Sequence, residues 1–476
     1  MIFGCKSSPI FDSTIVVNQR ATIKGTRQQS ADLMGGDFFL LSVVLLPVIS
    51  ARLVAGKRYM FHLAGLTCFA GIAFLLMLLL LNDEFPFAGG GDDEGYFDAS
   101  NQSFTSLDDW FDMARYEHHE QAGYPLLLSW VHQFSEDSLY HLKALNVFFL
   151  LEIALVWFAI GMLIGGKRLA FIYAYGMLLA TPLWYYWLFL LKDMAITLLQ
   201  SIFVLGLISF VSGEHRFRGY AVIALSTLAV IPFRSMLAVS NVALLVACMF
   251  LQGRSGTSGA SFGTRLTLVA SLAVGLWLFS SQPGVMETLG VKGEDRSLTV
   301  EGVKAQLESD VFDRQQFAQN PLMFAVLYLV GETDALNPAN WGQFDLALLR
   351  PLSMVPWIFL GLPFFLAGVA MILRRTRAWK VFASGLRHND DRAAGEDLGQ
   401  GQTSSLSVLL AFIVAYATVG WLTGTTVRWT LPTIPPMVAI AGFAWTNMNR
   451  HARIRLLTAF DFPVLTLIVT YYLVLK

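Results

Sequence analysis

Three consecutive carboxylates, Asp92, Asp93 and Glu94, follow a run of glycines and precede the aromatic pair Tyr96 and Phe97. Carboxylates this close repel one another, and near low-dielectric lipid such a group acts as a general base or as a cation site. The triplet therefore supplies three candidate catalytic residues. A solvated acidic loop has the same composition, so the motif alone leaves both interpretations open.

A second pair of charges interrupts a long apolar stretch. Lys192 and Asp193 are the only charged residues between positions 169 and 211. An ionisable residue at the end of a membrane helix is a functional hypothesis by default. The alternative is a structural ion pair that closes a turn. If Asp193 lies on the same side of the membrane as Asp93, the two carboxylates are able to share one site.

A third motif lies near the C-terminus, where Arg428 begins a proline-rich apolar segment. Its guanidinium group can present two parallel donors to a phosphate. The alternative is an interfacial anchor, because Trp421 and Trp429 are close in sequence and tryptophan is enriched at membrane interfaces. Arg428 is thus a candidate phosphate-binding residue.

The elements that must position these residues are membrane helices. Of the 476 residues, 55% are hydrophobic and 14% are charged, whereas soluble proteins carry about 25% charged residues. The mean hydropathy of +0.56 arises from blocks of roughly 20 apolar residues separated by short charged stretches. This pattern predicts an all-α, polytopic integral membrane protein. The net charge of −1 excludes the broad basic field that attracts nucleic acid.

We predict about twelve membrane-spanning helices. Their approximate limits are residues 38–56, 61–82, 142–164, 169–190, 193–211, 220–233, 235–251, 264–281, 351–373, 405–424, 428–447 and 456–475. The two segments between residues 220 and 251 are each short for a span, and Pro232 and Arg234 interrupt them. They form either one kinked helix or a hairpin.

The distribution of basic residues favours the hairpin. Lysine and arginine in short loops mark the cytoplasmic side of a membrane protein. The basic short loops contain Arg52, Lys57 and Arg58; Lys167 and Arg168; Arg216 and Arg218; Arg254 and Arg265; Arg374, Arg375, Arg377 and Lys380; and Arg450, Arg453 and Arg455. These are alternate loops only if residues 220–251 cross the membrane twice, which places Arg234 near the outer face.

The same parity divides the chain into regions. The first large exterior loop holds thirteen acidic residues and a single basic one, Arg115. The predicted regions are a polar N-terminal tail (1–37), an N-terminal transmembrane region (38–281) with the exterior loop 83–140, a second exterior loop (282–349), and a C-terminal transmembrane region (350–476) with the cytoplasmic loop 374–404. The N-terminal tail is expected to be poorly ordered.

The three motifs, in this order and on one side of the membrane, resemble the GT-C superfamily of membrane glycosyltransferases. Protein O-mannosyltransferases and lipid A aminoarabinose transferases belong to that superfamily. The resemblance covers the order and topology of residues 61–447. It rests on the acidic motif at 92–97, the stretch from Pro182 to Asp193 and Met194, and the Arg-Trp-Thr-Leu-Pro motif at 428–432.

Residues 121–130 also resemble the family's Pro-Leu segment, which lies along the membrane surface. They form an amphipathic run of about ten residues, which is too short to span a bilayer. This segment contains Tyr124 and Pro125 and ends at Trp130.

The resemblance implies transfer of a sugar from a polyprenyl-phosphate carrier to a glycan, lipid or protein acceptor at the outer face. In the family, the acidic motif of the first exterior loop supplies the catalytic base. That position falls on Asp93, or on Asp92 if the register is one residue earlier, and Glu94 completes the candidate set. Phe97 or Tyr96 is then the accompanying aromatic residue.

The family's second acidic position falls on Asp193, which makes this residue a candidate ligand for a divalent metal ion. Lys192 stands where the family has a small polar residue, which argues against a metal and for contact with the carrier phosphate. The residues predicted to bind the carrier and its phosphate are Arg428 first, then Lys192 and Arg234, together with Tyr96.

The predicted partners are a polyprenyl-phosphate sugar, the acceptor and the lipid bilayer, with no nucleic acid. The loop charges suit a bacterial inner membrane with a periplasmic active face, although an endoplasmic reticulum enzyme has the same pattern. One alternative is an O-antigen or exopolysaccharide polymerase that joins lipid-linked repeat units. A transporter is less favoured, because the sequence has no internal repeat and few ionisable residues within its spans.

Overall fold

The computed structural model describes residues 13–83, 85–87, 92–101, 123–133, 138–212, 216–253, 329, 352–375, 400–422 and 431–470. Within these ranges every regular element is helical and no strand occurs, which confirms the all-α prediction. The elements are α1 (Ser13–Leu81), α2 (Asp92–Ser100), α4 (Gly123–His132), α5 (Leu139–Gly165), α6 (Lys167–Leu178), α7 (Thr181–Leu188), α8 (Asp193–Ser212), α9 (Arg216–Val230), α10 (Ser235–Gly253), η4 (Trp357–Gly361), α17 (Leu362–Arg375), α19 (Gln400–Leu422), η5 (Leu431–Thr433), α21 (Ile434–Asn447) and α22 (Arg450–Thr470).

Five stretches of the described chain are long and apolar enough to cross a membrane. They are Asp37–Ala55, Arg58–Leu81, Leu139–Gly165, Asp193–Ser212 and Leu352–Arg374. Shorter apolar helices lie in α9, α10 and α19. The membrane character of the chain follows from these helices. The count of about twelve spans stays a prediction, and one of them, 264–281, falls outside the described residues.

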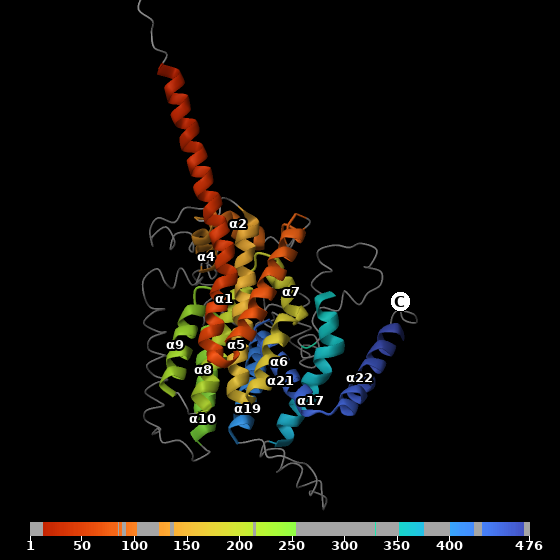
Figure 1. Ribbon diagram of the computed structural model, residues 1–476. Helices are drawn as coiled ribbons and strands as arrows, with labels where there is room; N and C mark the ends of the chain where they lie inside the picture. Colours follow the sequence, from red (N-terminus) through yellow and green to blue (C-terminus); the bar gives the residue numbers. More distant parts are fainter. Residues whose placement is uncertain are drawn as a thin grey trace, which may run out of the picture.

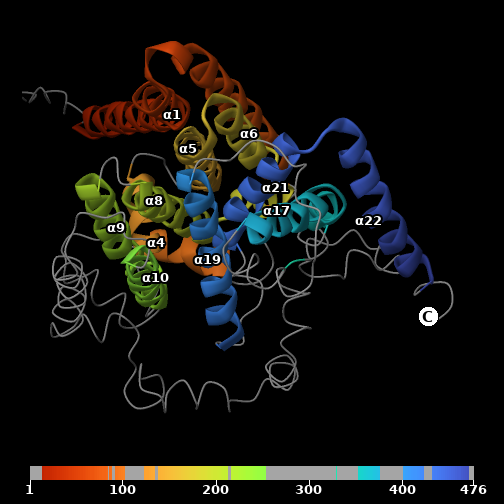
Figure 2. The ribbon, with the colours of Figure 1, turned by 90° about the horizontal axis from the view of Figure 1, so that it is seen from below.

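Helix α1 holds the first two of these stretches. Figures 1 and 2 show that it turns back on itself between them. The helix begins at Ser13, so most of the segment predicted to be a poorly ordered tail is helical. Phe38, Phe61 and Phe69 of α1 are 71%, 81% and 75% exposed. Large apolar side chains exposed along a helix at the edge of a bundle indicate contact with lipid.

The predicted span 169–190 is wrong as a single helix. It is divided into α6 and α7, with Leu179 and Ala180 between them. Pro182 lies in the first turn of α7. Proline has no backbone N–H and clashes with the preceding turn of a continuous helix, but it is well accommodated where a helix begins. The break therefore follows from the Thr181-Pro182 pair.

The predicted hairpin in residues 220–251 is confirmed. Helices α9 and α10 are separate and meet at a turn formed by residues 231–234. The backbone N–H of Arg234 donates to the carbonyl of Val230 at 2.8 Å, and the N–H of Leu237 donates to the carbonyl of Arg234 at 3.1 Å. Arg234 thus sits at the tip of the hairpin.

Basic turns lie at one end of the bundle, and the acidic helix α2 lies at the other (Figure 1). At one end, the ammonium group of Lys167 lies 4.9 Å from the ring centroid of Tyr59, so two basic turns meet. At the other end, α2 and α4 lie together with the tip of the α9–α10 hairpin (Figure 1). The side that faces the periplasm remains a prediction.

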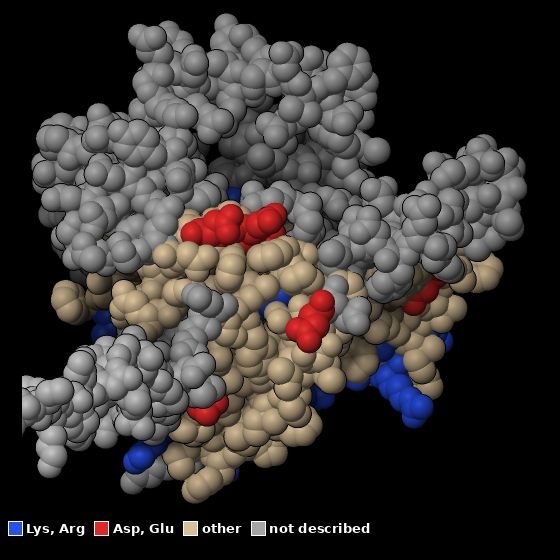
Figure 3. All heavy atoms as spheres, turned by 90° about the horizontal axis from the view of Figure 1, so that it is seen from above, with Lys and Arg blue, Asp and Glu red and all other residues tan. Residues whose placement is uncertain are grey.

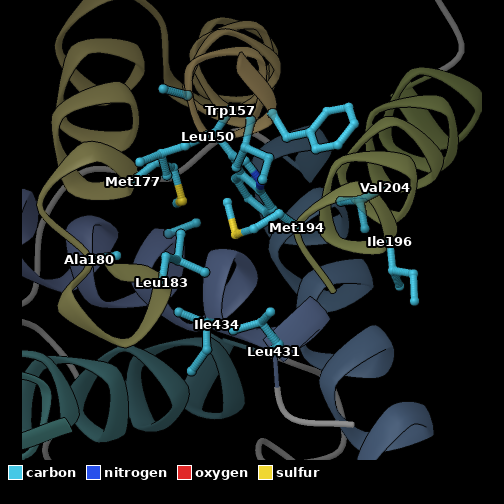
Figure 4. Packing of buried hydrophobic residues seen from close by; sticks show 14 of the residues in the cluster. Leu150, Trp157, Met177, Ala180, Leu183, Met194, Ile196, Val204, Leu431 and Ile434 are labelled. Carbon is cyan, nitrogen blue, oxygen red and sulfur yellow. The ribbon is translucent and has the colours of Figure 1, made fainter. Parts of the chain in front are cut away.

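The core lies where α5, α6, α7 and α8 meet η5 and α21 (Figure 4). Trp157 of α5 is fully buried, and its indole N–H donates to the hydroxyl of Ser201 on α8 at 3.0 Å. Gly161 lets α5 and α6 approach closely, because a Cβ at this position would lie 2.4 Å from the Cα of Ala170. This packing fixes α5 and α8, which carry several of the candidate site residues.

Candidate active site

The acidic triplet forms the start of a helix rather than a loop. Helix α2 begins at Asp92, and its first turn directs Asp93 inward and Glu94 outward. Asp93 is 1% exposed and Tyr96, one turn later, is 2% exposed, whereas Glu94 is exposed. The carboxylate of Asp93 accepts a hydrogen bond from the backbone N–H of Glu94 at 3.1 Å. Of the two predicted bases whose side chains are described, Asp93 is thus the buried one. The side chain of Asp92 lies outside the described residues.

Helix α4 packs against α2 and brings a tyrosine to the same place. Tyr124 is fully buried, and its ring meets that of Tyr96 edge to face with centroids 5.3 Å apart. The Tyr124 hydroxyl donates to the side-chain oxygen of Asn146 at 3.2 Å. The helix has 10 residues, in agreement with the predicted short segment. Tyr124 therefore links α2 to α5.

Asn146 in turn holds the turn that precedes Asp193. Its side-chain nitrogen lies 3.3, 2.6 and 3.3 Å from the carbonyl oxygens of Tyr186, Phe189 and Leu191, to which it donates. These carbonyls belong to the end of α7 and the non-helical residues before α8. A single buried amide thus satisfies backbone groups that no helix satisfies.

Lys192 and Asp193 are 1% and 3% exposed, so both charges are inside the protein. Asp193 is the first residue of α8, where the helix dipole favours a negative charge. Burial, more than any other effect, raises the pKa of the Tyr124 hydroxyl; the hydrogen bond to Asn146 opposes this, and the charges of Asp193 and Asp93 add to it. The charges of both carboxylates thus add to the raised pKa of one hydroxyl, and a site shared by the two carboxylates stays a prediction.

Sequence reasoning missed Lys143, which is also fully buried. Its ammonium group donates to the carbonyl oxygen of Phe85 at 2.8 Å and lies 5.7 Å from the ring centroid of Phe189. The charge of Asp93 acts on this ammonium group. The available signal was the spacing of Lys143 and Asn146, two polar residues one turn apart at the start of a long apolar helix. We call Asp93, Lys143, Lys192 and Asp193 the charged cluster.

Arg234 belongs to the same end of the molecule. The backbone N–H of Gly123 donates to the carbonyl of Pro232 at 3.0 Å. A Cβ on Gly123 would lie 2.9 Å from the Cβ of Pro232, so this contact depends on glycine. The hairpin tip that carries Arg234 is therefore fastened to the start of α4, next to Tyr124. Arg234 is half-buried.

Arg428 falls outside the described residues, but the segment that follows it does not. The turn η5 begins at Leu431 and packs against α8. The three motifs thus lie on α2, at the start of α8 and immediately before a turn that contacts α8. Figure 3, which looks down on the α2 end of the molecule, shows acidic side chains gathered on this face.

The described side chains do not fit a divalent metal ion. Within these ranges, no group of three or more His, Cys, Asp or Glu side chains is placed to hold one. Magnesium and calcium need several oxygen ligands, whereas the charged cluster offers two carboxylates beside two ammonium groups.

Comparisons of the chain with protein-family models, with curated proteins and with solved structures find no match. Two carboxylates, two ammonium groups and a hydrogen-bonded phenol gather at the end of a membrane bundle. Such a set can accept a proton at one oxygen and stabilise a negative charge a short distance away.

Proposed function

We propose that the chain is a membrane glycosyltransferase that moves a sugar from a polyprenyl-phosphate carrier to an acceptor at the periplasmic face of a bacterial inner membrane. The observation that carries this proposal is the meeting of two distant motifs. Asp93 and Asp193 are one hundred residues apart in sequence, and both are buried. On the Asp93 side, the ring of Tyr124 contacts that of Tyr96, one helical turn after Asp93. On the Asp193 side, the Tyr124 hydroxyl donates to Asn146, whose amide binds the carbonyl of Leu191, two residues before Asp193. The resemblance to the GT-C superfamily supplies the reaction, and the site supplies groups of the right chemistry.

The reaction is a displacement at the anomeric carbon of the sugar. Asp93 accepts the proton of the acceptor hydroxyl as the acceptor oxygen bonds to that carbon. The bond between the anomeric carbon and the phosphate oxygen breaks, and its electron pair leaves with the polyprenyl phosphate. Burial excludes water from Asp93, which limits hydrolysis of the donor.

The phosphate that leaves gains negative charge, and cations must stabilise it. Lys192 and Lys143 are the buried candidates, and Arg234 lies on the neighbouring hairpin tip. Arg428 stays the predicted phosphate ligand of the third motif. Lysine binds phosphate as a compact point charge with three rotatable donors. Tyr96 packs on Tyr124 beside Asp93, where it can contact the carrier.

Sugar transfer in proteoliposomes tests the proposal. The purified full-length chain is supplied with radiolabelled decaprenyl-phosphate mannose, glucose or galactose, or with a lipid-linked oligosaccharide, in the presence or absence of a chelator. We expect carrier-dependent transfer of one monosaccharide that continues with chelator present. Extension of the oligosaccharide without use of any monosaccharide carrier would instead identify a polymerase. Loss of transfer with chelator, restored by magnesium, would show that the reaction needs a metal ion, and it would overturn the expectation that lysine and arginine alone stabilise the phosphate.

A further inference from the structure

A second set of polar side chains lies inside the bundle, below the charged cluster. Gln200 of α8 and Asn241 of α10 are 0% and 1% exposed. In the part of the chain that the structure describes, neither amide atom of Gln200 has a hydrogen-bond partner, and the side-chain nitrogen of Asn241 has none either. An unpaired buried amide is costly, and lipid provides no water to satisfy it. These groups therefore need a polar ligand.

One of the two amides, that of Asn241, is hydrogen-bonded to a tyrosine. The Tyr416 hydroxyl of α19 donates to the side-chain oxygen of Asn241 at 3.1 Å. Helix α19 packs on α8 through Phe412 and Phe203, whose ring centroids are 6.4 Å apart, and Tyr416 stacks on Phe412 at 4.3 Å.

Helix geometry then places Gln200 level with Tyr416. Gln200 precedes Phe203 by three residues, and Tyr416 follows Phe412 by four, so each is one turn from the contact on the same face of its helix. The two helices run in opposite directions, with α8 starting and α19 ending toward the α2 end of the bundle (Figure 1). We call Gln200, Asn241 and Tyr416 the neutral layer.

The neutral layer and the charged cluster share helix α8. Asp193 and Gln200 are seven residues apart on α8, which is two turns on one face and about 10 Å along the axis. Helical side chains tilt toward the N-terminus of their helix, so the amide of Gln200 reaches back toward Asp193. Thr197, which is fully buried, lies between them. A hexose is of a size to bridge the two levels.

We propose that the neutral layer binds the hydroxyl groups of the transferred sugar, while the charged cluster holds its anomeric carbon and the phosphate. The proposal rests on the proposed glycosyltransferase function and adds a sugar site to it. Gln200, Asn241 and Tyr416 carry no charge, and amides can both donate to and accept from a hydroxyl group. This chemistry matches a neutral sugar rather than a phosphate. The vacant atoms of Gln200 and Asn241 are then the ones that the sugar satisfies.

Binding of paired carriers tests the sugar site. Full-length protein in nanodiscs is titrated with decaprenyl phosphate, and separately with decaprenyl-phosphate mannose, glucose and galactose. The ratio of affinities for the best sugar carrier and the bare carrier isolates the contribution of the sugar. We expect Gln200→Met to lower this ratio about tenfold, which corresponds to one lost hydrogen bond. Binding of bare decaprenyl phosphate should be unchanged. Lys143→Met, in contrast, should weaken both.

Ser201→Ala is the matched control, because it removes a hydrogen bond from the next position of α8, on the face toward Trp157. It should leave the ratio unchanged. The unfolding temperature of Gln200→Met should equal or exceed that of the wild type, since an unpaired buried amide is removed. Asn241→Leu and Gln200→Glu should also lower the ratio, and they decide the matter if Gln200→Met does not fold.

The outcomes separate the two proposals. A ratio that stays at the wild-type value in all three neutral-layer variants overturns the sugar site and leaves the transferase proposal standing. A wild-type ratio of one has the same meaning, because the protein then makes no contact with the sugar. A wild-type protein that binds none of the carriers overturns both proposals.

Discussion

Two buried amides on adjacent helices, Asn146 of α5 and Gln200 of α8, differ in how they are paired. Both are 0% exposed. Asn146 accepts from Tyr124 and donates to three backbone carbonyls, and it holds the turn before Asp193 in place. Gln200, by contrast, has no partner among the described residues. The first amide organises the charged cluster in the absence of any ligand. The second, two turns below Asp193, is arranged as a site that a ligand must complete.

This contrast separates residues that position the site from residues that contact substrate. Loss of a positioning residue should reduce stability, because it leaves backbone groups unpaired inside the protein. Loss of a binding residue should reduce affinity or rate without reducing stability. Variants of the two regions, each with a matched control, test this distinction.

The largest effect is expected from the charged cluster. Asp93→Asn removes the proton acceptor but keeps the size and shape of the side chain. A positioned base contributes roughly 10²- to 10⁴-fold to a rate, so transfer in proteoliposomes should fall by about that factor. Glu94→Gln, the next residue of α2 with an exposed side chain, is the control and should stay within about twofold of the wild type. If Asp93→Asn and Glu94→Gln lost activity equally, the buried position of Asp93 would not distinguish it as the catalytic base.

Asn146→Leu is expected to have the largest effect on stability. It removes the partner of the Tyr124 hydroxyl and of the carbonyls of Tyr186 and Leu191. The carbonyl of Phe189 keeps only the backbone N–H of Leu191. A buried group left unpaired costs about 1–3 kcal/mol, so the unfolding temperature should fall clearly. Gln200→Met should not lower it. A fall of the same size in both variants would remove the distinction between the two amides.

Sequence reasoning found the charges of the site more easily than the groups that hold them. Lys192 and Asp193 stand out because charges in apolar surroundings are rare and therefore informative. Asp93 stands out as the centre of three consecutive carboxylates. The hairpin of α9 and α10 followed from charge parity alone. Asn146 and Lys143 were missed because they lie inside what was interpreted as a plain span, where only three-dimensional contacts reveal their role. The division of 169–190 was missed although Pro182 signals it, because the apolar run was long enough to span.

The approach of α4 to the hairpin tip should be sensitive to one methyl group. In Gly123→Ala the new Cβ would lie 2.9 Å from the Cβ and 3.0 Å from the carbonyl oxygen of Pro232. Overpacking of this kind costs about 1–3 kcal/mol, and displacement of α4 should also slow transfer, because Tyr124 is the next residue. Gly65→Ala is the control, since a Cβ added there would have no atom within 4 Å. It should be neutral or slightly stabilising. Equal behaviour of the two variants would contradict the contact between α4 and the hairpin.

The smallest effect is expected from Tyr124→Phe, and it appears in the pH dependence. Burial raises the pKa of Tyr124 above that of an unfolded chain, with the charges of Asp193 and Asp93 adding to the effect. An ordinary tyrosine titrates near pH 10. Below that pH both states keep the proton, and the folded protein incurs no penalty. Above it the unfolded chain releases the proton while the folded protein retains it, so the free energy of unfolding declines as pH rises.

Tyr124→Phe should therefore lose about 0.5–1.5 kcal/mol at pH 8, the contribution of one hydrogen bond, but should decline less steeply than the wild type between about pH 10 and 11. Unfolding temperatures of both proteins across this range provide the measurement, and other tyrosines cancel in the comparison. Parallel curves would mean that water reaches the Tyr124 hydroxyl, which would contradict its burial. Water would then reach the charged cluster as it reaches the exposed side chain of Glu94.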